Sequence, residues 1–109
     1  MEISEAKKNG VVVLGLSGRV DASNAAVLEQ KILALIGAGE SCLVLDCAQL
    51  QYMSSAGLRV LLVAAKRLGS SKLAIAALSN QIHDVFDIAG FSSILQICGT
   101  EEEAVAAVQ

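Results

Sequence analysis

The fold of this chain is decided by one stretch of its sequence, Tyr52-Met53-Ser54-Ser55-Ala56-Gly57-Leu58-Arg59-Val60-Leu61-Leu62. The short apolar run over 42–46 comes just before it and is typical of a buried strand. After it, apolar residues recur at the spacing of one helical face, which predicts a helix over 55–68. The two serines are therefore expected where a loop that follows a strand turns into a helix.

The residue types at this helix start have clear physical uses. Ser54 or Ser55 could cap the helix, because a hydroxyl at the N-cap accepts a hydrogen bond from a free backbone N–H. Gly57 has no Cβ, so another backbone or a partner could approach closely there. The free N–H groups and the positive end of the helix dipole also make the position suitable for an anion.

This stretch, after an apolar strand ending in Asp46, resembles the phosphorylation-site motif of the STAS family. More narrowly, it resembles the small bacterial anti-sigma factor antagonists. Two further segments agree with this resemblance. The G-x-(Leu/Val)-D-x-x-x-A element of the family resembles Gly18-Arg19-Val20-Asp21-Ala22-Ser23-Asn24-Ala25. The other segment begins with Val85-Phe86 and continues with Gly90-Phe91, Leu95, Ile97 and a helix start at Thr100/Glu103. The resemblance runs from about Gly10 to the end of the chain.

The residue pattern predicts one α/β domain over 1–109, in the order ββαβαβαβα. We expect a mixed sheet of about five strands packed with four helices, which is also the fold that the STAS resemblance implies. The expected strands are 2–8, 11–16, 42–46, 73–77 and 94–97. The expected helices are 21 to about 36, 55–68, 79 or 80 to 90, and 100 to about 108.

Local signals refine this outline. Asn9-Gly10 predicts a hairpin turn between the first two strands, and the alternation of helix and strand after it predicts parallel neighbours. The third helix is expected to point four residues inward, namely Ile82, Val85, Phe86 and Ala89. Thr100 to Glu103 is typical of a capping box at the start of the last helix.

Composition excludes several classes of function. The formal net charge is −3, the eight Lys and Arg residues are scattered, and there is one Tyr, two Phe and no Trp, which argues against a nucleic-acid partner. The N-terminus lacks the apolar core of a signal peptide, and no apolar run reaches the length of about 18 residues that crosses a bilayer. We therefore expect a soluble cytoplasmic protein without membrane insertion.

No catalytic, cofactor or metal site is predicted. The chain lacks a P-loop, a G-x-S-x-G elbow and a dinucleotide fingerprint, so a small enzyme or nucleotide-binding protein is a poorly supported alternative. His83 has no Ser, Cys or acid partner at a motif spacing and is expected on a helix surface. Cys42, Cys47 and Cys98 are expected to be free thiols packed as small hydrophobes, and a metal site or a redox pair is the alternative. If both Cys42 and Cys47 lie in the strand, they point to opposite faces of the sheet.

The resemblance assigns a role to Ser55. Taken alone, this serine is a helix cap; aligned on Gly57, it falls at the position that anti-sigma factor antagonists phosphorylate. Ser54 stands where the commonest form of the family has Asp, which makes Ser54 an alternative phosphoacceptor.

A partner surface is expected around this serine. Asp21, Ser23 and Asn24 are ordinary helix-start residues, but the resemblance implies that their loop lies beside Ser55 and contacts the partner. On the helix over 55–68, a stripe of mostly small apolar residues falls opposite the core face, namely Ala56, Val60, Val63 and Arg67. Arg59 and Lys66 flank this stripe. We expect the stripe to be exposed for docking of a partner, unless another element of the domain covers it. The predicted partner-binding residues are thus Asp21, Ser23, Asn24, Ser54, Ser55, Ala56, Gly57, Arg59, Val60 and Val63.

The resemblance implies a partner switch rather than catalysis. The unphosphorylated protein would bind an anti-sigma factor that is also a serine kinase and so free the sigma factor. ATP-dependent phosphorylation of Ser55 would release the antagonist, and a PP2C-type serine phosphatase would reset it. The alternatives are a STAS module that controls a target other than sigma, and a soluble accessory STAS subunit of a membrane transport system.

Overall fold

The computed structural model describes residues 1–109 and contains five strands and four α-helices in the predicted order. In chain order the elements are β1 (Glu2–Lys8), β2 (Val11–Val20), α1 (Ala25–Gly37), β3 (Leu43–Met53), α2 (Ser55–Leu68), η1 (Ser70–Lys72), β4 (Leu73–Ala76), α3 (Asn80–Ile88), η2 (Phe91–Ser93), β5 (Gln96–Cys98) and α4 (Glu101–Val108). The two η elements are single 3₁₀ turns. None of the helices combines the length and the apolar character that a membrane span requires.

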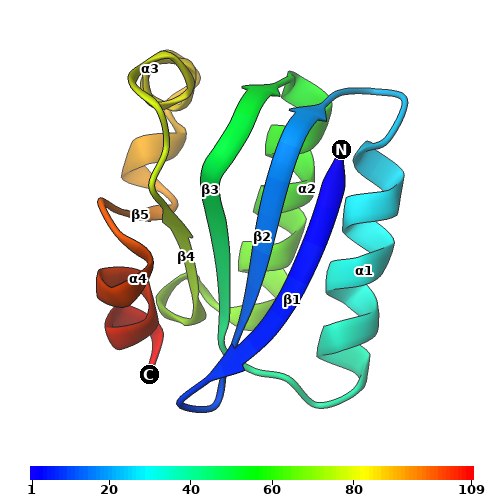
Figure 1. Ribbon diagram of the computed structural model, residues 1–109, viewed down its shortest axis with the longest axis vertical. Helices are drawn as coiled ribbons and strands as arrows, with labels where there is room; N and C mark the ends of the chain where they lie inside the picture. Colours follow the sequence, from blue (N-terminus) through cyan, green and yellow to red (C-terminus); the bar gives the residue numbers. More distant parts are fainter.

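The strands form one mixed sheet in the order β1-β2-β3-β4-β5 (Figure 1). β1 pairs antiparallel with β2, and the other three pairs are parallel, as the alternation of elements predicted. Asn9 and Gly10 have φ values of 53° and 80°. Positive φ at both turn residues matches the twist of a two-residue hairpin, so the predicted Asn-Gly turn is confirmed.

The helices divide between the two faces of the sheet. The larger core combines buried residues of β2, β3 and β4 with residues from α1, α2 and α3, including Leu28, Leu61 and Phe86. The smaller core lies on the other face, where Ala104, Val105 and Val108 of α4 cover alternate residues of the same strands. Figure 1 shows α1 and α2 running alongside each other and α4 next to β4. This layering positions the start of α2 directly over the ends of β2 and β3.

The second and third strands are longer than the sequence pattern predicted. β2 continues to Val20 and β3 continues to Met53, so the expected loop before Ser54 is absent. The pairing shifts register twice, between Gly15 and Ser17 and between Gly18 and Arg19. These irregularities break the two-residue alternation that marks a strand in a sequence, which explains why the ends were missed.

Other boundaries also differ from the prediction. α1 begins at Ala25 rather than at Asp21, because residues 22–24 form a turn before the helix. β5 begins at Gln96, two residues later than expected, since η2 occupies 91–93. In α3, Ile82 and Phe86 are buried as predicted, but Val85 and Ala89 are exposed. The inward assignment of the latter two was wrong because this short helix contacts the core along one narrow stripe.

The three cysteines are free thiols. Cys47 is buried in the larger core, whereas Cys42, which stands just before β3, packs against the smaller one, so the two lie on opposite faces of the sheet. Burial raises the pKa of Cys47 to about 12. Because the thiolate is the reactive form, Cys47 is chemically inert at neutral pH.

Candidate functional site

The two segments with the predicted site residues meet at one edge of the sheet. β2 and β3 are parallel and paired through their last residues, Val20 and Met53, so the segments that follow both strands leave from the same end (Figure 1). The backbone N–H of Ser54 donates to the carbonyl oxygen of Val20 at 2.9 Å. This hydrogen bond ties the start of α2 to the residue that precedes Asp21.

Ser54 is the N-cap residue of α2, with extended backbone angles of φ −87° and ψ 174°. Its carbonyl oxygen accepts the hydrogen bond of Leu58 N–H at 3.1 Å, which starts the helix. Its side chain, however, makes no capping hydrogen bond, and Oγ is buried without any partner. Of the two serines that the sequence left open as the cap, Ser54 thus takes the N-cap position, but its hydroxyl does not cap the helix.

Ser55 is the first residue of α2, and its side chain is exposed. No acidic residue lies in the first turn of this helix. No side chain of the first turn of α2 therefore neutralises the positive end of the helix dipole or the free N–H groups there. An exposed hydroxyl stands at a helix start that favours negative charge.

Gly57 is buried against the sheet rather than open to a partner. A Cβ on this glycine would lie 2.9 Å from Cγ1 of Val20 and 2.9 Å from Cγ of Met53. The close approach that the sequence suggested is thus made by side chains of β2 and β3. Gly57 acts inside the fold, where it lets the first turn of α2 sit directly on the sheet.

The predicted exposed stripe on α2 is only partly exposed. Val63 is 37% exposed, but Ala56 is half-buried and Val60 is 6% exposed within the larger core. α1 packs against α2 and covers this side of the helix. The expectation of exposure was wrong for Val60, since the periodicity of one helix does not show that a second helix lies beside it.

Residues 21–24 form a tight turn held by its own side chains. The Asp21 carboxylate accepts from the backbone N–H of Ser23 at 2.9 Å and from its hydroxyl at 2.5 Å. The Asn24 side chain accepts from Asp21 N–H at 3.0 Å and donates to the Arg19 carbonyl oxygen at 2.9 Å. The two hydrogen bonds from Ser23, first that of the hydroxyl, lower the pKa of Asp21 below its usual value. The turn therefore presents an ionised carboxylate in a fixed conformation.

An Arg–Tyr contact at the same edge escaped the sequence reasoning. The guanidinium of Arg19 lies over the Tyr52 ring, with Cζ 4.3 Å from the ring centroid. The two residues are register neighbours on β2 and β3, and Tyr52 is 40% exposed. The pair could not be seen in the sequence, because the strand that carries Tyr52 was expected to end at Asp46.

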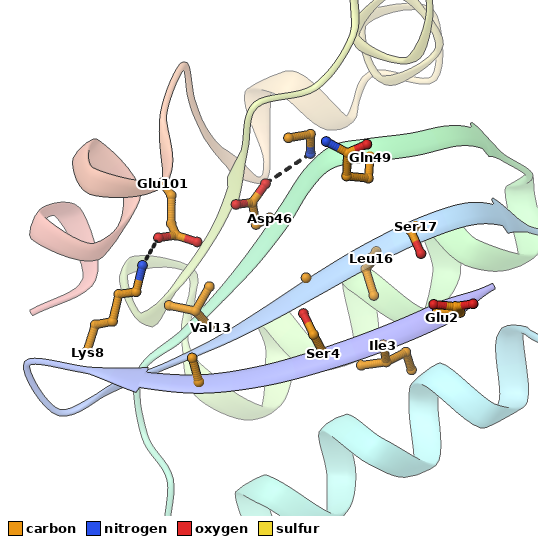
Figure 2. A pocket seen from close by; sticks show the side chains of 13 residues that line it. Glu2, Ile3, Ser4, Lys8, Val13, Leu16, Ser17, Asp46, Gln49 and Glu101 are labelled. Carbon is orange, nitrogen blue, oxygen red and sulfur yellow. Dashed lines mark hydrogen bonds and ion pairs between the residues drawn. The ribbon is translucent and has the colours of Figure 1, made fainter.

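A groove of about 460 Å³ lies elsewhere and contains none of the predicted site residues (Figure 2). It opens over β1, β2 and β3, where small residues such as Ser4 and Gly15 leave the sheet bare. An ion pair between Lys8 and Glu101 stands at one end, and the Asp46 carboxylate accepts from Ala48 N–H at 2.9 Å inside it. The groove is open and its lining mixes polar and apolar residues, so it does not resemble an enclosed ligand pocket.

His83 lies on α3, with its side chain 43% exposed, and differs from the prediction in one respect. Its Nδ1 is 3.2 Å from Oδ2 of Asp87, one helical turn later. The acid partner that the sequence reasoning did not find therefore exists. With Asp84 these residues bring three possible ligand atoms within 4.8 Å of one another, all at the surface.

Comparison with known proteins agrees with this architecture. The sequence profile of the STAS domain matches residues 2–104. BtrV of Bordetella bronchiseptica, itself assigned provisionally as an anti-sigma factor antagonist, is 38% identical over 109 residues, which cover 98% of this chain and 94% of BtrV.

Solved structures have the same fold. The crystal structure of an anti-sigma factor antagonist from Mycobacterium paratuberculosis has a TM-score of 0.89 and 25% identity, with 98% of this chain and 92% of that chain covered. The structure of the Bacillus cell fate determinant SpoIIAA in its phosphorylated form has a TM-score of 0.74 and 22% identity, with 99% of this chain and 100% of that chain covered. At this identity the match shows that the two chains share a fold. From the profile and from the identity to BtrV, this chain belongs to the STAS domain family, within the anti-sigma factor antagonists.

Proposed function

We propose that this chain is the antagonist in a phosphorylation-controlled partner switch. In its unphosphorylated form it binds an anti-sigma factor that is also a serine kinase, and the sigma factor is released. The kinase then phosphorylates Ser55, the complex dissociates, and a PP2C-type phosphatase restores the first state. Anti-sigma factor antagonists are non-enzymatic regulators, so the chain acts as ligand and substrate.

The observation that carries this proposal is the different exposure of two adjacent hydroxyl groups. The Ser55 side chain is exposed at the first position of α2, whereas Ser54 Oγ is buried. A kinase must bring the hydroxyl into line with the γ-phosphate of ATP. The exposed hydroxyl of Ser55 is accessible to a kinase in the folded chain and the buried hydroxyl of Ser54 is not, which supports Ser55 over the alternative phosphoacceptor.

The transfer step needs nothing from this chain except the hydroxyl. Ser55 Oγ forms a bond to the γ-phosphorus of ATP, and the bond from that phosphorus to the bridging oxygen breaks, so ADP leaves with the electron pair. The hydroxyl proton passes to a base of the kinase. The phosphatase later replaces the Oγ–P bond with a bond to water oxygen, which returns Ser55 and inorganic phosphate.

Phosphorylation is expected to change binding and preserve the fold. A phosphate adds about 1.5 to 2 negative charges at neutral pH. At the start of α2 those charges are stabilised by about 0.3–1 kcal/mol, because the helix dipole and the free N–H groups favour an anion. A partner pressed against Ser55 meets the added bulk and charge, and it must also desolvate the phosphate.

The proposed contact surface consists of the exposed and half-buried residues at this edge. On the turn that precedes α1, Asp21, Ser23 and Asn24 stay candidates, and on α2 so do Ser55, Ala56, Arg59 and Val63. Ser54 contributes through its backbone position. Gly57 and Val60 act inside the fold, so we remove them from the partner surface.

Mass spectrometry on protein purified from its native cells tests the proposal. We expect one phosphate on Ser55, absent in Ser55→Ala and retained in the matched neighbour Ser54→Ala. A phosphate on Ser54 would contradict the site. No phosphate during growth, stress or starvation would contradict the switch.

A binding measurement tests the second half of the switch. Unphosphorylated chain used as bait should retain a kinase-type anti-sigma factor, and Ser55→Asp should weaken that binding at least tenfold. Ser54→Ala is the control and should bind as the unchanged chain does. Full affinity of Ser55→Asp for the partner would contradict the proposed release by negative charge.

A further inference from the structure

Arg59 stands one helical turn after Ser55 on the exposed face of α2. Residues four apart on a helix have Cβ atoms about 5–6 Å apart. Helical side chains also lean toward the N-terminus, so a residue covers the surface of the turn before its own. From this geometry we expect the long side chain of Arg59 to reach over Ser55.

The Arg59 guanidinium has no partner in the folded chain. It takes part in none of the side-chain hydrogen bonds, ion pairs or cation–π contacts, and α2 contains no acidic residue. Three lysines elsewhere do pair with glutamates, namely Lys7 with Glu40, Lys8 with Glu101 and Lys31 with Glu5. Nothing in the unphosphorylated fold uses the charge of Arg59.

We propose that Arg59 is a positioning residue that binds the phosphate of phosphorylated Ser55 and leaves the partner surface when it does so. This inference rests on the proposed function, because it requires phosphate on Ser55. Arginine suits the role, since its planar fork donates two parallel hydrogen bonds to phosphate oxygens. Phosphorylation then changes two groups at once: the serine becomes an anion, and the Arg59 guanidinium turns from the partner to the phosphate.

The surrounding charges favour this pairing. On α2 the remaining cations, Lys66 and Arg67, lie in the last turn of the helix. On the neighbouring edge, Arg19 is engaged with the Tyr52 ring, and Asp21 carries a negative charge that repels a phosphate. The N-terminal ammonium of Met1 also lies at this edge, beside Gly18, where it contributes to the lowered pKa of Asp21. Arg59 is the cationic side chain that stands one helical turn from Ser55 on the same helix.

The test uses protein with phosphoserine built into position 55 during translation, so that no kinase is required. The second ionisation of the phosphate, with a pKa of about 6, is followed by ³¹P NMR against pH. A nearby cation favours the doubly charged form and lowers this pKa. We expect Arg59→Gln to raise it by about half a pH unit or more.

Arg67→Gln is the matched control, because it removes the same charge from the same helix. Arg67 lies twelve residues after Ser55, about 18 Å along the helix axis and beyond the screening length of about 8 Å at physiological salt. We expect this variant to titrate as the unchanged protein does. Equal phosphate pKa values in Arg59→Gln, Arg67→Gln and the unchanged protein would overturn the proposal.

A second measurement separates this inference from the partner switch. Unphosphorylated Arg59→Gln should keep the Tm of the unchanged protein, since the side chain is exposed and unpaired. The rise in Tm on phosphorylation should be smaller in Arg59→Gln than in Arg67→Gln, and an equal rise would count against the pairing. Neither result depends on whether cells phosphorylate Ser55, so the proposed function can fail while this pairing stands, and the reverse.

Discussion

The starts of α2 and α4 differ in how the free N–H groups and the positive end of the helix dipole are treated. At α4, Thr100 Oγ1 accepts from Glu103 N–H at 3.2 Å, and Glu101, Glu102 and Glu103 fill the first turn. At α2, the serine in the equivalent N-cap position makes no such bond, and no acid follows it. One helix neutralises its own positive end, and the other leaves that end open.

The difference shows where this fold reserves room for an added anion. The start of α4 is stable by itself and would gain nothing from more negative charge. The start of α2 is held instead by the contact of Gly57 with β2 and β3 and by the hydrogen bond from Ser54 to Val20. Packing secures this helix start, so its electrostatic potential stays available to a phosphate or a partner.

The largest effect should come from disturbing that packing. Gly57→Ala places a Cβ 2.9 Å from Val20 and Met53 side-chain atoms, closer than real contacts allow. We expect the free energy of unfolding in urea to fall by about 1–3 kcal/mol, despite the better helix propensity of alanine. Gly37→Ala at the end of α1 is the control, because nothing lies within 4 Å of its new Cβ. Equal stability of the two variants would show that α2 is not fixed in this way.

The two N-cap residues should respond with opposite signs. Thr100→Ala removes a capping hydrogen bond and should cost about 1 kcal/mol of unfolding free energy. Ser54→Ala removes a buried hydroxyl without a partner, so stability should be unchanged or rise by up to about 1 kcal/mol. Thermal unfolding of both variants measures the contrast. A loss at Ser54 as large as that at Thr100 would mean that Ser54 caps α2 after all.

The smallest effect concerns the acid beside the open helix start. The Ser23 hydrogen bonds hold the pKa of Asp21 below its ordinary value of about 3.9. A lowered folded-state pKa gives stability that is present above the unfolded value and is lost as pH falls through the folded one. NMR titration should therefore place the Asp21 midpoint low in the unchanged protein and higher in Ser23→Ala. The control Ser92→Ala, on an exposed turn, should not change the titration midpoint of Asp21. An unchanged Asp21 midpoint in Ser23→Ala would refute the assignment of the lowered pKa to the Ser23 hydrogen bonds.

Much of the fold could be predicted from the sequence because its signals are local. The Asn9-Gly10 turn and the Thr100 cap each depend on a few consecutive residues, and both were found at the expected place. The order of strands and helices followed from hydrophobic periodicity. Family membership followed from three short motifs, which the profile match over residues 2–104 bears out.

The errors share one physical cause, which is that they depend on contacts between distant segments. β3 was predicted to end at Asp46, because the shifted pairing with β2 destroys the alternation that marks a strand. Val60 was expected outside, since one helix does not reveal that α1 lies beside it. The inward rotation of the Ser54 hydroxyl and the stacking of Arg19 on Tyr52 arise only when the sheet has formed.

The close packing of the first turn of α2 on β2 and β3 also affects how a change at Ser55 is recognised. With Gly57 against Val20 and Met53, the first turn of α2 is packed too closely on the sheet to accept even one added methyl group without movement. We therefore expect a partner to recognise a phosphate on Ser55 by direct contact, without a change in the rest of the domain. Duplicated copies of such a chain could therefore bind new partners after a few surface side chains are exchanged, while the packed core stays the same.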